Sequence, residues 1–334
     1  GMEDGFQGTR MTEWDGAEGV MGSYLQGFPY ADYWRMHVEK NGRELVNWTR
    51  GKTFDKNWSG ETQALEEFAN VVQDTNGAAR CLQLRGEYMF VAEGKGGFMV
   101  YDVASIGNKG LSERILTAPF SPLGHDPRVK SRNATCVALP TNQNISFARN
   151  ESIRKNYPEN QEQAFHPIYR YAVVTDAEEG LILVDVDTFA DGEPRNNFVK
   201  RALTWNEGGV LDGARHITLG GYYAYVTTPA GLVVIDLNDP MRPRHAATVP
   251  MNDARASALQ FRYLWVTDAE GLKVLDVTRM DDPKLVPGAT VPLADARRIY
   301  LARTYAYVAA KQDGLVIVNV TNPERPRLYQ KVTL

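Results

Sequence analysis

A repeat of about 40 residues constrains the fold of this chain more than any other feature. Each of three copies contains Ala-Arg, a short apolar segment ending in Leu, an aromatic segment with Val, Gly-Leu, and an alternating segment ending in Asp or Asn. The glycines of the three copies are Gly231, Gly271 and Gly314, which lie 40 and 43 residues apart. A period in this range is typical of proteins in which similar units pack against one another.

Two less regular copies precede these three, beginning at residue 78. Every copy contains four short segments rich in Val, Ile, Leu and Tyr and bounded by Gly, Pro or Asp, which predicts strands buried between layers. In the first two copies the expected strands are 79–84, 88–93, 97–103, 113–119, 134–139, 169–177, 180–186 and 197–205. Four-stranded units repeated radially form a β-propeller, whereas a β-solenoid uses shorter coils. The sequence therefore predicts an all-β protein, a five-bladed propeller over residues 78–334.

Residues 1–77 carry no copy of the repeat and are expected to form an irregular N-terminal arm rich in Trp and Gly. Within the arm, Asn41-Gly42 predicts a hairpin over residues 33–49, because both turn positions tolerate positive φ. Apolar residues spaced i, i+3, i+4, i+7 after Ser59 predict one helix that ends at Asn76-Gly77. The hairpin would supply part of a sixth blade in the alternative, six-bladed architecture.

Three segments resemble LVIVD repeats: GLVVIDLNDPMRP (231–243), GLKVLDVTRMDDP (271–283) and GLVIVNVTNPERP (314–326). Such repeats occur in bacterial and archaeal β-propellers of the cell surface or periplasm. The resemblance covers residues 78–334 and implies an extracytoplasmic protein from a family with no shared catalytic motif. Residues 169–276 are similar to large members that accompany multihaem cytochromes, which implies an interaction subunit with a protein partner of that kind.

Charge and motif content exclude several classes of function. The net charge of −4 disfavours nucleic acid or an anionic membrane as the main partner, since both need a basic surface. No apolar run approaches the roughly 18 residues of a transmembrane helix, and no signal peptide is recognised. The chain has two cysteines and five histidines, without CxxC, CxxCH or HExxH spacing. We therefore expect no metal, no haem and no other cofactor bound by this chain.

The second position of the expected first strands is arginine in four copies: Arg80, Arg215, Arg255 and Arg297. These strands should line the central channel, where four like charges repel one another unless acidic groups lie among them. One interpretation is a structural network with acidic turns at the same end and with Asp212, Asp253 and Asp295. The other is a site at the channel mouth for an anion, an acidic ligand or an acidic partner segment, which suits the arginine fork.

The third position of the same strands holds Cys81, Cys136 and His216 in the first three copies. Equivalent residues on neighbouring blades are expected about 10 Å apart, beyond the reach of a disulfide, so the sequence predicts buried free thiols. A metal site of two cysteines and His216 is disfavoured, because the other two copies have Ala256 and Arg298 at this position. The aspartates that end the third strands are expected to stabilise turns rather than to catalyse a reaction.

Partner contacts are expected from two regions. Trp14, Trp34, Trp48 and Trp58 are four of the six tryptophans, and they suit either an interface or attachment of the arm to the propeller. The polar insertion 140–168 is a long loop on a rigid scaffold, which is often functional.

The resulting hypothesis is a non-enzymatic, extracytoplasmic interaction or scaffold subunit, with a multihaem-cytochrome electron-transfer complex as the implied assembly. The alternative is a propeller that binds or hydrolyses a small anionic or carbohydrate ligand at the arginine-lined mouth. A third possibility is a purely structural module of the cell surface.

Overall fold

The computed structural model describes residues 78–86, 88–102, 128–140, 166–190 and 199–333. The chain divides into two compact units, and the unit comprising residues 77–99, 129–191 and 200–334 holds nearly all of the described residues. The expected arm over 1–77, with its hairpin and helix, lies outside them. Helical turns in the described part are short 3-10 segments: η4 (Pro167–Arg170), η5 (Asp187–Ala190), η7 (Glu207–Gly209) and η8 (Lys311–Asp313).

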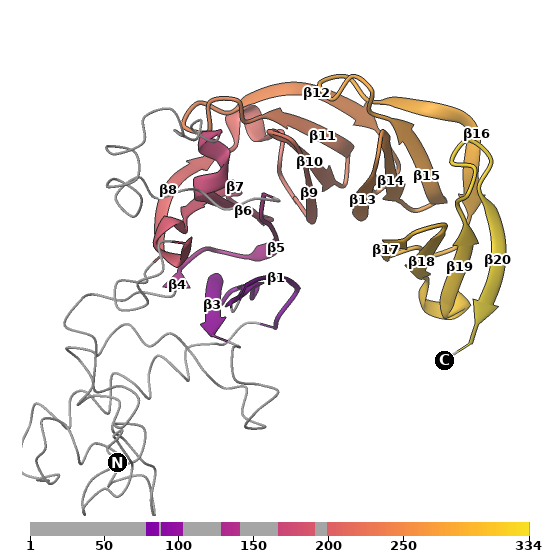
Figure 1. Ribbon diagram of the computed structural model, residues 1–334, viewed down its shortest axis with the longest axis horizontal. Helices are drawn as coiled ribbons and strands as arrows, with labels where there is room; N and C mark the ends of the chain where they lie inside the picture. The colour runs from indigo at the N-terminus through magenta and orange to yellow at the C-terminus, as the bar shows by residue number, and fades with distance from the viewer. Residues whose placement is uncertain (1–77, 87, 103–127, 141–165, 191–198, 334) are drawn as a thin grey trace, which may run out of the picture. The chain divides into compact units, whose positions relative to one another are not determined.

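Five four-stranded antiparallel sheets follow one another along the chain, and each is built from consecutive strands (Figure 1). Blade 1 comprises β1 (Cys81–Arg85), β2 (Tyr88–Ala92), β3 (Phe98–Asp102) and β4 (Arg128–Val129). Blade 2 comprises β5 (Ala134–Ala138), β6 (Tyr171–Asp176), β7 (Gly180–Asp185) and β8 (Lys200–Trp205). Blade 3 comprises β9 (His216–Gly220), β10 (Tyr223–Thr228), β11 (Gly231–Asp236) and β12 (Arg244–Pro250). Blade 4 comprises β13 (Ala256–Gln260), β14 (Tyr263–Thr267), β15 (Gly271–Asp276) and β16 (Lys284–Pro292), and blade 5 comprises β17 (Arg298–Ala302), β18 (Tyr305–Ala309), β19 (Leu315–Asn319) and β20 (Arg327–Val332).

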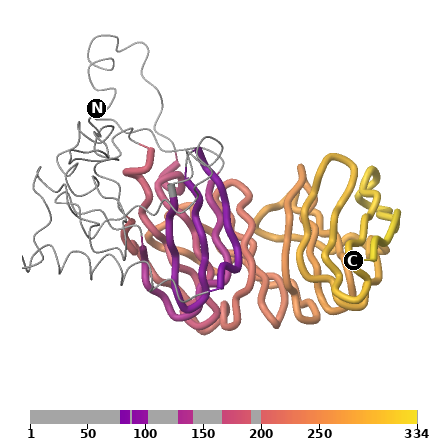
Figure 2. The backbone as a smooth tube through the Cα atoms, turned by 90° about the horizontal axis from the view of Figure 1, so that it is seen from below, coloured from indigo at the N-terminus to yellow at the C-terminus, as the bar shows by residue number. Residues whose placement is uncertain are grey.

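The first strands of successive blades are neighbours: β1 contacts β5, β5 contacts β9, β9 contacts β13, and β13 contacts β17. Within each blade the strands lie side by side, as Figure 2 shows. Neighbouring strands pair antiparallel, for example β10 with β11, β14 with β15 and β18 with β19. This arrangement is a five-bladed β-propeller and confirms the fold predicted from the repeat. It also brings equivalent positions of the repeat together at the inner strands, where the candidate site residues lie.

The repeated Gly-Leu has a steric cause. Gly231 and Gly271 begin the third strands of blades 3 and 4 with φ of 142° and 143°, which side chains with a Cβ rarely adopt. A Cβ at either position would overlap a carbonyl oxygen of the adjacent fourth strand, that of Val249 or Val291. Gly97 and Gly314 meet a carbonyl of the fourth strand in the same way, and Gly180 meets the Trp205 carbonyl together with the Asn206 side chain. Glycine therefore allows the outer two strands of each blade to pair closely.

That contact corrects one prediction. The fourth strand of blade 1 was expected at 113–119, a stretch that lies outside the described residues, but β3 pairs instead with β4. Val129 presents its carbonyl to Gly97 just as Val249 does to Gly231. β4 has only two residues, too few to show a period-2 pattern in the sequence.

The hydrophobic core lies between blades rather than within one. Blade 4 contributes the fully buried Trp265 together with Leu272 and Val274, which pack against Val308 and Val316 of blade 5. Similar clusters join blade 2 to blade 3 and blade 3 to blade 4. The leucine at the sixth position of the inner strands packs into these clusters in blades 3, 4 and 5, whereas Leu84 of blade 1 is 64% exposed.

The third strands end in a repeated side-chain turn. In blades 2 to 5 a side-chain oxygen accepts a hydrogen bond from the backbone N–H two residues later, at 2.7–3.1 Å. The residues that do so are Asp185, Asp236, Asp276 and Asn319. This geometry confirms the structural role predicted for these carboxylates, because their oxygens are engaged by the turns that they stabilise.

Candidate functional site

A row of alternating arginines and aspartates connects blades 3, 4 and 5 at the start of their first strands. Arg215 donates to Asp253 Oδ1 at 2.5 Å, and Asp253 Oδ2 accepts from Arg255 Nε at 3.0 Å. Arg255 also donates to Asp295 Oδ1 at 2.8 Å, and Arg297 Nε lies 2.7 Å from the same oxygen. We call these five residues the arginine clasp. The clasp neutralises most of its own charge, with three cations and two carboxylates.

The clasp forms because the copies of blades 4 and 5 place Asp two residues before Arg, as Asp253 and Arg255 and as Asp295 and Arg297. Burial alone would raise the pKa of Asp253, but hydrogen bonds from Arg215 and Arg255 hold that pKa below its ordinary value. The pKa of Asp295 is likewise lowered: desolvation opposes the shift, and Arg297, Lys311 and Arg255 outweigh it. Both carboxylates therefore stay ionised at neutral pH and remain committed to the arginines.

The clasp side chains also bind the backbone of the next blade. Arg215 donates to the carbonyl of Ala254 at 3.3 Å, and Arg255 donates to that of Ala296 at 3.0 Å. Thr135 occupies the same position in blade 2 and donates to Ala214 O at 2.9 Å. In blades 2, 3 and 4 the second position of the inner strand thus donates a hydrogen bond to the backbone of the following blade, whether it is threonine or arginine. This explains the repeated pair of Ala and a hydrogen-bond donor.

Arg80 differs from the other three arginines predicted to form the site. Its guanidinium lies over Gly94, and it makes no ion pair with any residue that the structure describes. The structural network predicted from the sequence is therefore present for Arg215, Arg255 and Arg297. Its acids are Asp253 and Asp295, rather than the acidic turns between second and third strands. Anion binding by the four arginines stays a prediction, and it would have to compete with two resident carboxylates for three of them.

The acidic turns have other partners. Asp268 is fully buried and forms an ion pair with Lys273 Nζ at 2.8 Å, and Glu270 lies 3.1 Å from the same ammonium. Glu179 accepts from Arg201 at 2.6 Å. Sequence reasoning missed both basic partners, because their place beside a turn follows from strand pairing rather than from spacing along the chain. The acidic side chains of these two turns thus pair with basic residues of their own blade.

The third position of the inner strands contradicts the predicted free thiols. Cys81 and Cys136 form a disulfide with an S–S distance of 2.10 Å and a Cα–Cα distance of 4.7 Å. The prediction failed because β1 and β5 converge much closer than the expected separation of about 10 Å, into the range that a disulfide spans. The bond joins blade 1 to blade 2 and uses both cysteines of the chain.

His216 lies beside this disulfide. Its Nδ1 accepts from the backbone N–H of Ser257 at 3.3 Å. Burial, with a smaller contribution from the charge of Arg298, lowers the pKa of His216 from 6.5 to about 3. The imidazole is therefore neutral at ordinary pH. Arg298 donates to the carbonyl of Arg80 at 2.9 Å, which joins the inner strand of blade 5 to the start of blade 1.

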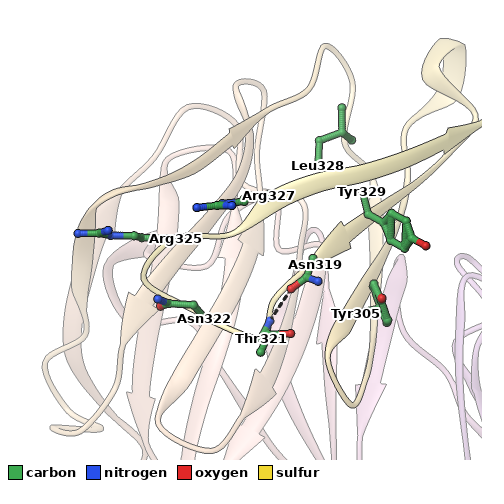
Figure 3. Close-up of a pocket in the computed structure, with 8 residues that line it drawn as sticks. All are labelled: Tyr305, Asn319, Thr321, Asn322, Arg325, Arg327, Leu328 and Tyr329. Carbon is green, nitrogen blue, oxygen red and sulfur yellow. Dashed lines mark hydrogen bonds between the residues drawn. The ribbon is translucent and has the colours of Figure 1, made fainter.

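A surface hollow of about 510 Å³ lies on blade 5 (Figure 3). The rings of Tyr305 and Tyr329 lie 5.2 Å apart at one side of it, and Arg325 and Arg327 lie on the other. The side-chain oxygen Oδ1 of Asn319 accepts a hydrogen bond from the backbone N–H of Thr321 and so belongs to the turn that ends β19. No residue predicted for the site lies here.

The predicted partner contacts fall outside the described residues. This applies to Trp14, Trp34, Trp48 and Trp58 and to almost all of the insertion 140–168. Within the described part of the chain, no helix has the length and apolar character to cross a membrane.

The LVIVD repeat family model matches residues 76–117, 213–249 and 294–333. The chain therefore carries LVIVD repeats in three segments. Two of them contain the Gly-Leu segments 231–243 and 314–326 that showed the resemblance, whereas the segment 271–283 lies outside the matched residues. No curated protein matches the chain.

Solved structures resemble this chain in fold alone. A Bacteroides uniformis protein described as a "putative 6-phosphogluconolactonase" matches over 76% of this chain and 70% of its own, with 13% identity and a TM-score of 0.51. The computationally designed protein Ika8 matches over 76% and 61%, with 8% identity and a TM-score of 0.46. The β-propeller domain of Myceliophteria thermophila Cps50 (Swd1) matches over 78% and 73%, with 14% identity and a TM-score of 0.46. The chain spans 61% of the length of the designed protein.

Proposed function

From a five-bladed propeller that carries LVIVD repeats, we propose that this chain is a non-enzymatic, extracytoplasmic interaction subunit. The observation that carries the proposal is the Cys81–Cys136 disulfide between blades 1 and 2. Disulfides persist in oxidising compartments and are rare in the cytosol, where thiols are kept reduced. The bond also stabilises the propeller, because it restricts the conformations of the unfolded chain.

The use of the polar residues supports a scaffold rather than an enzyme. A catalytic site needs acids, bases or nucleophiles that are free to act on a substrate. Here the carboxylates of the clasp are bound by arginines, and those that end the third strands are bound by turns. The buried Asp268 is paired with Lys273. These groups stiffen the propeller and so hold its loops in fixed positions for a partner.

The contacts with that partner are proposed to come from the Trp-rich arm and the 140–168 loop. A multihaem cytochrome is the partner to test first, because residues 169–276 resemble proteins that accompany such cytochromes. The chain itself has no CxxCH haem site, so it would bind the cytochrome rather than carry electrons.

The test is mild affinity isolation of the chain from its source cells, followed by an absorption spectrum and mass analysis of what accompanies it. The proposal predicts a Soret band and cytochrome peptides in constant proportion to the chain. Replacing Trp34 and Trp48 with alanine should reduce the recovery of the partner. Phe261→Ala is the matched control, because Phe261 is an aromatic residue 93% exposed on the propeller itself. A colourless protein that comes alone would contradict the proposed assembly.

A further inference from the structure

Three side chains with metal-binding atoms come together from three successive blades. The sulfurs of Cys81 and Cys136 and a ring nitrogen of His216 all lie within 4.8 Å of one another. Each occupies the third position of its repeat, in blades 1, 2 and 3 respectively. Among the residues that the structure describes, this is the one group of three His, Cys, Asp or Glu side chains with such geometry.

Two thiolates and an imidazole are a donor set typical of zinc, which binds Cys and His in tetrahedral sites. We propose that reduction of the Cys81–Cys136 disulfide creates a site for one Zn²⁺, held by both sulfurs and His216 between the first strands of blades 1 to 3. The oxidised chain cannot form this site, because both sulfurs are bonded to each other. The site is independent of the proposed role as an interaction subunit.

The distances suit such a site. With Zn–S near 2.3 Å and Zn–N near 2.0 Å, tetrahedral donors lie roughly 3.5–3.8 Å apart. The three donors are already within 4.8 Å, and the Cα atoms of the two cysteines are 4.7 Å apart. Opening the sulfurs to the required spacing therefore needs side-chain rotation and no separation of the blades.

The reaction balances with a named reductant. A dithiol gives two electrons and two protons to the disulfide, the S–S bond breaks, and the dithiol becomes a disulfide itself. Zinc then binds the two sulfurs as thiolates, and their two protons pass to solvent. The imidazole binds through a nitrogen that carries no proton.

The remaining two blades shape the site without adding a donor. Ala256 fills the equivalent position in blade 4, so the fourth zinc position would be open to water or a small exogenous thiol. Arg298 fills it in blade 5, near enough for its charge to act on His216. The positive charge of Arg298 repels an uncompensated Zn²⁺ and stabilises thiolates, so the negative charge of both thiolates is needed for zinc to bind. Loss of one cysteine should therefore abolish binding rather than weaken it.

Zinc binding requires one rearrangement of His216. Its Nδ1 now accepts from Ser257 N–H at 3.3 Å. If Nδ1 binds zinc, it leaves this hydrogen bond, and if Nε2 binds zinc, the proton moves to Nδ1 and the acceptor is lost. The Ser257 amide should therefore exchange its hydrogen faster when the reduced chain holds the metal.

The experiment uses the full chain, reduced by a dithiol that is then removed under anaerobic conditions, and Co²⁺ as the spectroscopic probe. The proposal predicts one Co²⁺ per reduced chain, with sulfur-to-cobalt charge-transfer bands, and none for the oxidised chain. Zinc should displace the cobalt. Cys136→Ser should remove the bands, and His216→Ala and His216→Gln should each weaken zinc binding by at least about tenfold. His245→Ala is the control, since His245 lies on β12 and contacts Thr248.

Circular dichroism of each protein checks that the strands persist. Three results would overturn the proposal: no cobalt bound by a reduced and folded chain, equal binding by the His216 variants, or equal binding by the oxidised chain. Unfolding on reduction would also overturn it, because no preformed site would then exist.

Discussion

Arg255→Ala removes the central side chain of the arginine clasp. This side chain is only 13% exposed, and it joins Asp253 at 3.0 Å, Asp295 at 2.8 Å and the carbonyl of Ala296 at 3.0 Å. Hydrogen bonds to charged groups contribute about 1.5–3 kcal/mol each. Their contributions do not add fully here, because Asp253 keeps Arg215 and Asp295 keeps Arg297 after the substitution. We therefore expect the free energy of unfolding to fall by about 2–3 kcal/mol.

Urea unfolding followed by circular dichroism measures this loss as a lower midpoint at an unchanged slope. The matched control is Arg279→Ala: Arg279 pairs with Asp281 at the same 2.8 Å, but its side chain is 69% exposed. An exposed pair of this kind contributes about 0–1 kcal/mol. If Arg255→Ala loses no more stability than Arg279→Ala, the clasp does not couple blade 4 to blade 5.

Three further predictions concern stability. Gly271→Ala should cost about 3 kcal/mol or more in urea unfolding, because the new methyl group meets the Val291 carbonyl at a φ of 143°, whereas Gly288→Ala has open space and should cost only about 1 kcal/mol for its φ of 76°. The disulfide closes a loop between residues 55 positions apart, so its reduction should lower the free energy of unfolding by about 4 kcal/mol in the same assay. A chain with both Cys81→Ser and Cys136→Ser should lose no stability when the reductant is added. The pKa of His216 is about 3 in the folded chain and near 6.5 in the unfolded chain, so between these pH values only the unfolded chain binds the proton. The free energy of unfolding should therefore be unaffected by His216 above pH 6.5 and should fall by up to about 1.4 kcal/mol per pH unit below it. His216→Gln should flatten this pH dependence of the urea midpoint. A His216→Gln variant with the same pH dependence as the unchanged chain would contradict a desolvated, neutral imidazole at His216.

The fold could be predicted from the sequence because each blade repeats the same steric requirements. Glycine recurs at Gly231, Gly271 and Gly314 since a Cβ there would overlap the next strand, and Asp or Asn recurs where the third strand must turn. Such constraints act within one unit of the repeat, so they leave a regular pattern along the chain. β4 was placed wrongly because a strand of two residues leaves no such pattern.

The site was harder to predict because it depends on how close neighbouring blades lie at the inner strands. Comparison of the repeat copies within the chain placed the arginines of the clasp near acidic groups at one end of the propeller. It could not show that Asp253 bridges Arg215 of the preceding blade to Arg255 of its own. The Cys81–Cys136 bond was missed for the same reason, since a spacing of 55 residues says nothing about the approach of β1 to β5.

The proposed role places this propeller outside the reducing cytosol as an interaction subunit, with blades 1 and 2 joined by the disulfide. The most direct test is mass spectrometry of the chain taken from its source cells and treated at once with a thiol-alkylating reagent, before and after reduction. An extracytoplasmic chain should show no alkylated cysteine before reduction, and alkylation of both Cys81 and Cys136 after it. Two alkylated cysteines before reduction would show free thiols in the cell and would contradict the extracytoplasmic role.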